Sequence, residues 1–304
     1  MRIGIIGSGA VGSLFAAHLA LLDDVETWIY DVSRAHVDAI NADGLRLTGV
    51  GEVHSHPRAT TNADELPALD FAIVATKGMH TRAAMEDTAK AVSEGAVCSV
   101  QNGIGNEEVI AEFVRAVIRG TTFPAGKLVG PGVVQWDTAG KTWIGPFEPH
   151  PATMGQVHAL ADILTRSGME TLALEDARGA QWTKLVFNAA SNALCSLTQL
   201  PHGRAAINAD VRWVMDQVIR EGKDVAAALG IEMETDPAEL LEESIGVALD
   251  HKPSMLQDVL ARRPTEIDQL NGGIVRLGDE MGIATPLNRA AYALIKGLEA
   301  SWKL

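Results

Sequence analysis

Residues 1–12 read "MRIGIIGSGAVG", and nearly uncharged sequence continues to Leu22. Such a run could be an export signal, a membrane span or the first turn of a nucleotide-binding domain. A membrane span needs about 20 mostly apolar residues, but four glycines and His18 interrupt this one. The spacing of the apolar residues also changes along the run. Residues 3–6 resemble a buried strand, whereas the large apolar residues of 14–22 recur at helical spacing. The stretch therefore predicts a strand, a glycine turn and a helix.

The glycines of this turn are spaced as G-x-G-x-x-G at Gly7, Gly9 and Gly12. In that motif the first glycine permits a tight turn, the second admits a pyrophosphate, and the third lets helix and strand pack closely. The next predicted strand, "VETWIY", is followed by Asp31, 19 residues after Gly12. An acidic residue there can bind the adenosine ribose. The pattern indicates dinucleotide binding rather than an ordinary α/β turn, and the predicted cofactor contacts are Gly7, Ser8, Gly9, Ala10, Val11, Gly12 and Asp31.

Strands and helices alternate through the first half of the chain, which is typical of a doubly wound parallel sheet. From residue 175 onward the apolar residues follow the helical period. We therefore expect an α/β, Rossmann-type domain over residues 1–174 and an all-helical domain over residues 175–304. Within the first domain, "GVVQW" and "KTWIG" (132–145) are expected to form a hairpin. Helices are expected over residues 107–116 and 266–281.

Composition excludes several classes of protein. The 304 residues carry a net charge of −14, which argues against a nucleic-acid partner or an anionic membrane surface. An anionic substrate would need local cations. The two cysteines, Cys98 and Cys195, form no disulfide framework and favour a reducing, cytoplasmic compartment. No zinc-ligand cluster is apparent, so no metal is predicted. The oligomeric state is not readable from the sequence, and a homodimer stays open.

Polar residues follow two of the predicted strands or recur along one helix. Lys77 follows "DFAIVAT", and Asn102 follows "AVCSV" in "QNG". Ligands of such sheets bind beyond the carboxyl ends of the strands, although a solvated lysine and plain turn chemistry would also explain these residues. Lys184, Asn188 and Asn192 are spaced i, i+4 and i+8, which places them near one helix face. From spacing alone, an ordinary solvated face explains them better.

Taken together, these stretches resemble the ketopantoate reductases (2-dehydropantoate 2-reductases) over nearly the whole chain. The resemblance rests on "GSGAVG", "VATKGMHT", "QNGIGNEE", "WTKLVFNAASN" and "SMLQDVLARRPTEIDQLNGGIVRLG". It implies reduction of a 2-oxo acid by a nicotinamide cofactor. It also implies site residues: Lys184 as general acid, Glu266 for the substrate hydroxyl, Asn188, Asn192 and Ser254 as substrate contacts, and Asn102 and Lys77 in the cofactor and substrate crevice.

The sequence departs from the family pattern at the cofactor. NADP is the family norm, often with an arginine after the second strand, but this chain has Asp31 there. A carboxylate can accept both ribose hydroxyls yet repels a 2′-phosphate, so NAD is favoured, although Arg34 could still reach a phosphate.

Two other functions stay open on the sequence. The stretch "YDVSRAHVDAINADGLRL" is similar to the NAD-dependent D-2-hydroxyacid dehydrogenases of the same family, which act on mandelate-type substrates. A regulator that senses NAD(P) without catalysis would need the glycine turn but not Lys184, Asn188, Asn192 or Glu266. Their joint presence favours an enzyme.

Overall fold

The computed structural model describes residues 1–303, which form two compact units. The first unit comprises Met1–Gln101 and Asn106–Ala177, and the second comprises Asn102–Gly105 with residues from Arg178 onward. The boundary predicted at residue 174 lies three residues before the end of the first unit at Ala177. No local pattern in the sequence assigns the four residues 102–105 to the second unit.

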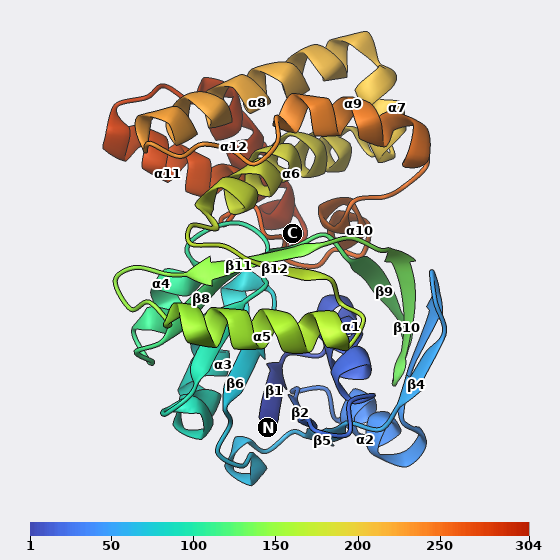
Figure 1. Ribbon diagram of the computed structural model, residues 1–304. Coiled ribbons are helices and arrows are strands. Elements are labelled where there is room, and N and C mark those ends of the chain that lie inside the picture. Colours follow the sequence, from blue (N-terminus) through green and yellow to red (C-terminus); the bar gives the residue numbers. More distant parts are fainter. Residues whose placement is uncertain (304) are drawn as a thin grey trace. The chain divides into compact units, whose positions relative to one another are not determined.

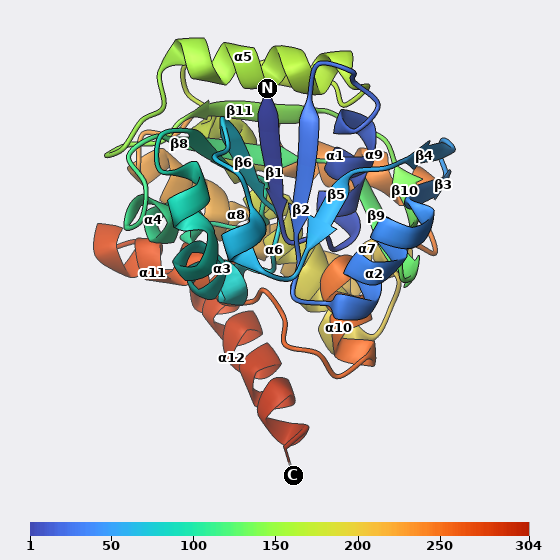
Figure 2. The same ribbon diagram turned by 90° about the horizontal axis from the view of Figure 1, so that it is seen from below.

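An eight-stranded sheet forms the centre of the first unit, in the order β12-β11-β8-β7-β6-β1-β2-β5 (Figures 1 and 2). Neighbouring strands are parallel, except that β11 runs antiparallel to β8. The chain moves outward from β1 in both directions, so the order reverses between β1 and β6. In doubly wound sheets ligands bind at this reversal, beyond the carboxyl ends of the strands. The strands are β1 (Arg2–Ile6), β2 (Glu26–Tyr30), β5 (Arg58–Thr60), β6 (Phe71–Val74), β7 (Ala96–Ser99), β8 (Val117–Thr122), β11 (Thr142–Pro146) and β12 (Thr171–Ala173).

Helices bury the apolar side chains of both faces of this sheet. One core joins strand residues such as Ile3 and Ile5 to α1 (Ala10–Leu19), α2 (Arg34–Asp43) and α5 (Met154–Arg166). Another core joins Ile6 and Val74 to α3 (Thr81–Thr88) and α4 (Asn106–Ala111). Three short 3₁₀ helices complete the connections: η1 (Ala63–Glu65), η2 (Gly78–His80) and η3 (Ala89–Val92).

A second, four-stranded sheet in the order β4-β3-β10-β9 packs against α1. Its strands are β3 (Leu45–Gly49), β4 (Val53–Ser55), β9 (Ala125–Gly130) and β10 (Val133–Thr138). The predicted hairpin between "GVVQW" and "KTWIG" is wrong, because β10 pairs with β9 and β11 pairs with β8. The turn lies instead at Pro131–Gly132. The break at Phe123–Pro124 then divides one long antiparallel pair between two sheets, since proline cannot donate a ladder hydrogen bond.

The second unit is a helical bundle built around α6 (Arg178–Thr198) (Figure 1). The buried residues of α6 include Trp182, Leu185, Ala189 and Ala193. The helices α7, α8, α9, α10 and α12 all contact α6. Ile104, from the short segment that follows β7, belongs to the same core. The remaining helices are α7 (His202–Ile207), α8 (Ala209–Ala228), α9 (Pro237–Val247), α10 (Ser254–Leu260), α11 (Asn271–Met281) and α12 (Pro286–Ser301).

Two predicted helices are shorter than expected. The helix expected over 107–116 ends at Ala111 because residues 117–122 are drawn into the sheet as β8. The helix expected over 266–281 begins at Asn271, so Glu266 lies in the turns before α11. In residues 1–303, no helix combines the length and the apolar character needed to cross a bilayer.

Candidate active site

The glycine turn lies where the predicted motif places it, between β1 and α1. Gly7 has a φ of +88°, a conformation that favours glycine. A Cβ on Gly12 would lie 2.0 Å from the Gly7 carbonyl oxygen, so only glycine lets α1 approach this turn. Gly9 is exposed, and nothing lies within 4 Å of where its Cβ would be. This open space at the start of a helix, with Ala10 and Val11 as the first helical residues, fits a pyrophosphate.

Asp31 follows β2, and its carboxylate is already oriented by hydrogen bonds. Oδ2 accepts from the Ser8 amide at 2.7 Å and from the Ser8 hydroxyl at 3.0 Å, while Oδ1 accepts from the Ser33 amide at 2.8 Å. The contact from Ser33 was not predicted, although an aspartate that bonds the backbone two residues on is a recognisable turn signal. The exposed Arg34 donates to the Thr61 hydroxyl at 3.3 Å.

Lys77 lies in the loop after β6, where it precedes η2 and is partly buried. Gln101, which the sequence analysis did not single out, ties this loop to the end of β7. Its side-chain amide donates to the Thr76 carbonyl at 3.0 Å and to the Thr81 hydroxyl at 2.8 Å. Its oxygen accepts from the Ser99 hydroxyl at 3.2 Å. A polar residue directly after a buried strand was the available signal.

Three predicted site residues meet in the second unit. Lys184 Nζ donates to Asn102 Oδ1 at 2.8 Å, and Asn102 Nδ2 donates to Glu266 Oε2 at 3.2 Å. Glu266 is 5% exposed. An ammonium has only donors and a carboxylate only acceptors, so these two neighbours dictate which end of the Asn102 amide faces which charge.

Burial changes the acidity of this ammonium. It lowers the pKa of Lys184 from 10.5 to about 8, and the negative charge of Glu266 opposes the change. A lysine whose pKa lies near the operating pH is suited to donate and recover a proton. The sequence could place a lysine on a helix face, but it could not reveal this shift.

The Asn102 segment is held in the second unit by close backbone packing. Gly103 has a φ of +81°, and a Cβ on it would lie 2.4 Å from the Gln269 carbonyl oxygen. The Ile104 amide donates to that same carbonyl at 3.0 Å, and the Gln181 side chain donates to the Gly103 carbonyl at 3.3 Å. The glycine of "QNG" therefore permits the approach that brings Asn102 to Lys184.

The other predicted substrate residues belong to the same unit. Asn188 and Asn192 follow Lys184 at one-turn intervals along α6, where Asn188 is partly buried and Asn192 is 4% exposed. Ser254 is the exposed first residue of α10. Asp31 and Lys77 belong to the first unit. The chain thus carries its candidate cofactor residues chiefly in one unit and its candidate acid–base residues in the other.

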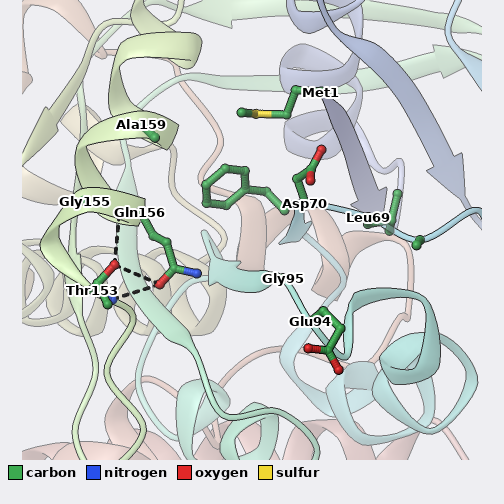
Figure 3. Close-up of a pocket in the computed structure, with 11 residues that line it drawn as sticks. Met1, Leu69, Asp70, Glu94, Gly95, Thr153, Gly155, Gln156 and Ala159 are labelled. Atoms are coloured by element: carbon green, nitrogen blue, oxygen red, sulfur yellow. Dashed lines mark hydrogen bonds between the residues drawn. The ribbon is translucent and has the colours of Figure 1, made fainter.

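A cavity of about 490 Å³ in the first unit is lined by none of the predicted site residues (Figure 3). Met1, Asp70 and Gly95, which line it, precede or begin β1, β6 and β7, and Thr153 caps α5. It therefore opens at the amino ends of the parallel strands, whereas the glycine turn lies at their carboxyl ends. Across residues 1–303, no group of three or more His, Cys, Asp or Glu side chains could hold a metal ion.

Comparison with known proteins points to one family. The sequence pattern described as "Ketopantoate reductase PanE/ApbA" matches residues 3–149, and "Ketopantoate reductase PanE/ApbA C terminal" matches residues 176–299. The 2-dehydropantoate 2-reductase of Pyrococcus horikoshii is 33% identical over 303 residues, which cover 99% of this chain and 98% of the relative. That of Pyrococcus abyssi is 32% identical over 300 residues, with the same shares of each chain covered.

Solved structures agree over the whole chain. A PanE/ApbA family ketopantoate reductase from Ralstonia eutropha JMP134 superposes with a TM-score of 0.90 at 31% identity, with 100% of both chains covered. D-mandelate dehydrogenase, solved with NADH and anilino(oxo)acetate, superposes with a TM-score of 0.89 at 26% identity, again over 100% of both chains. On this combined match in sequence and fold, the chain belongs to the ketopantoate reductase family of nicotinamide-dependent oxidoreductases.

Proposed function

We propose that this chain reduces the keto group of a 2-oxo acid, with ketopantoate as substrate and pantoate as product. The observation that carries the proposal is the partly buried Lys184 ammonium, bonded to Asn102 at 2.8 Å and subject to the charge of Glu266. When bound, the reduced nicotinamide supplies a hydride to C2 of the substrate. Negative charge then develops on the keto oxygen, and a preorganised cation stabilises it.

Lys184 is the proposed general acid. Its ammonium both stabilises the oxyanion and donates the proton that completes the hydroxyl. Its positive charge also suits the substrate carboxylate, which a chain of net charge −14 would otherwise repel. With a pKa of about 8, the group is mostly protonated at neutral pH and can still release its proton during the reaction.

Asn102 and Glu266 complete the proposed proton-donating site. The Asn102 amide holds the ammonium at one end and the carboxylate at the other, so it fixes the direction of both. The Glu266 charge raises the pKa of Lys184 and so favours its protonated form. We further propose that Glu266 accepts from the substrate hydroxyl, and that Asn188, Asn192 and Ser254 bind the substrate as uncharged polar groups.

NADH is the proposed cofactor, held by Gly7–Gly12, Asp31, Lys77 and Asn102. The Ser8 and Ser33 donors keep the Asp31 carboxylate in place, and its remaining lone pairs are suited to the ribose hydroxyls. A 2′-phosphate would meet this carboxylate with like charge. Catalytic efficiency with each cofactor tests the assignment, and a strong preference for NADPH would contradict it.

Replacing Lys184 with alanine tests the mechanism. Loss of a positioned acid typically costs about 10²–10⁴-fold in turnover, so kcat for ketopantoate should fall by that order while NADH binding survives. Lys223→Ala is a matched control, because Lys223 is a surface lysine of the same unit that pairs with Asp236 at 2.6 Å. Near-normal turnover in Lys184→Ala would remove Lys184 from the mechanism.

A mandelate-type D-2-hydroxyacid dehydrogenase is the second candidate. It is supported by the superposition on D-mandelate dehydrogenase, which was solved with NADH, and by Asp31, whose carboxylate favours NADH over NADPH. Comparing kcat/KM for 2-oxo acids with branched, linear and aromatic side chains separates the candidates. Preference for the aromatic acid would replace ketopantoate as the substrate, whereas NADH binding without turnover on any of these acids would favour a sensing role.

A further inference from the structure

We propose that His36 is a positioning residue of the cofactor site: together with Ser13 it holds the Ser8 carbonyl and so directs the Gly9 amide toward the pyrophosphate. The inference rests on the proposed cofactor site at the glycine turn. No step of the proposed reaction uses His36, which is a fully buried titratable residue of α2 at 2% exposure.

A chain of contacts links the second sheet to the glycine turn. The Gly132 amide donates to His36 Nδ1 at 3.0 Å, and His36 Nε2 lies 3.5 Å from the Ser13 hydroxyl. The Ser13 hydroxyl donates to the Ser8 carbonyl at 2.8 Å. Ser8 and Ser13 are 1% and 0% exposed, so water does not compete for these groups.

The first contact sets the direction of all the others. Because Nδ1 accepts from the Gly132 amide, the single proton of a neutral ring must be on Nε2. Nε2 therefore donates toward Ser13, whose own proton is directed at Ser8. Burial lowers the pKa of His36, which favours the neutral ring, while the Asp31 charge and a hydrogen bond to the Ser8 backbone oppose this.

The Ser8 carbonyl matters because it shares a peptide plane with the Gly9 amide. In a trans peptide the C=O and N–H bonds point in opposite directions. A carbonyl held toward Ser13 therefore turns the Gly9 N–H the other way. Gly9 is exposed and has open space around the position of its absent Cβ.

This peptide needs an external restraint. Ser8 stands between Gly7 and Gly9, and glycine allows backbone rotations that other residues resist. The amide that meets the pyrophosphate is therefore in the part of the turn that rotates most easily. The Ser13 and His36 contacts remove that freedom before the cofactor arrives, which lowers the ordering cost of binding.

The anchor of this chain is itself firmly held. Gly132 lies at the turn between β9 and β10 with a φ of +70°, and its carbonyl accepts from the Arg46 amide at 2.9 Å. The second sheet thus supplies a fixed donor for the His36 ring.

Two substitutions of His36 separate positioning from mere anchoring. The shorter amide in His36→Asn can still accept from Gly132 but cannot reach Ser13, whereas His36→Gln can place a donor near Ser13 and Ser8. Dissociation constants for NADH, NADPH and ADP-ribose are measured by titration of the full-length enzyme. We expect His36→Asn and Ser13→Ala to weaken all three by about fivefold, the factor for one net hydrogen bond, and His36→Gln to stay near wild type.

The controls exclude a general loss of packing. His18→Asn removes another buried histidine, one whose Nδ1 lies 2.8 Å from the Leu14 carbonyl in α1, and should leave all three affinities unchanged. In the His36 and Ser13 variants, kcat at saturating cofactor and KM for the 2-oxo acid should also stay unchanged. Ser13→Ala decides the question if His36→Asn does not fold.

Several results would overturn the inference. If His36→Asn and Ser13→Ala both bind the cofactor with wild-type affinity while Gly9→Ala loses it, the proposed restraint on the Ser8 carbonyl is refuted and the cofactor site is not. If His36→Asn binds the cofactor more tightly than His36→Gln does, the His36 ring only holds Gly132 and does not position Ser8. No binding of NADH by the wild type, or unchanged binding by Gly9→Ala, would instead refute the proposed cofactor site and this inference with it.

Discussion

The pH dependence of keto-acid reduction tests the Lys184 site most directly. The reaction consumes the ammonium proton, so the rate should follow the protonated fraction of a group with a pKa of about 8. That fraction is about nine-tenths at pH 7 and about one-tenth at pH 9 for such a pKa. We expect kcat/KM for the 2-oxo acid to be flat below pH 8 and to fall about tenfold per pH unit above it.

Oxidation of the 2-hydroxy acid should show the opposite sign. In that direction Lys184 must accept a proton, so kcat/KM should rise toward pH 8 and level off above it. A solvated lysine would place both transitions near pH 10.4. The cause of the difference is burial of the ammonium, which lowers its pKa.

Glu266→Gln provides a matched perturbation of the same group. The Glu266 charge raises the pKa of Lys184, so its removal should move the decline in reduction to lower pH. Each unit of movement corresponds to about 1.36 kcal/mol of lost interaction. The assay is NADH oxidation from pH 5.5 to 10 at constant ionic strength. A wild-type transition near pH 10, or movement to higher pH in Glu266→Gln, would refute the reasoning.

Three further predictions concern the cofactor turn and stability. Asp31→Asn should lower the NADH-to-NADPH ratio of kcat/KM, since it removes the charge that a 2′-phosphate meets; an unchanged ratio would count against Asp31. Gly9→Ala should keep the melting temperature but lose NADH affinity, whereas Gly12→Ala should unfold at lower temperature because its Cβ would lie 2.0 Å from the Gly7 oxygen; equal melting temperatures would contradict this. Lys184→Met should raise the melting temperature at pH 7 by a few degrees, because burial penalises the charged form of Lys184 below pH 8. This increase should become smaller toward pH 10.5, where the lysine of the unfolded chain also loses its proton, and an increase that grows with pH would contradict the prediction.

The patterns that predicted the structure correctly are those in which residues close in the sequence determine the backbone conformation. The glycine turn is one, because Gly12 approaches the Gly7 carbonyl oxygen within the turn itself, only five positions along the chain. The α6 helix is another, since its apolar residues recur at 3.6-residue spacing whatever packs against them. Both follow from the backbone preferences of short segments.

Strand pairing could not be predicted so well. The β10 and β11 segments are three residues apart, yet they pair with different strands in different sheets. Which strands pair depends on the side chains buried on each face across the whole unit, and that is not a local property. The Glu266 segment was also assigned to a helix, but α11 begins only at Asn271.

The sequence by itself determined the order of strand, glycine turn and helix, the acidic residue after β2, and the helical character of the second half. Only the tertiary structure decided that Asn102, 82 positions from Lys184 and 164 from Glu266, stands between them. The physical reason is that periodicity and backbone propensity act over a few residues. Hydrogen bonds, burial and the pKa of Lys184 depend instead on atoms brought together from distant parts of the chain.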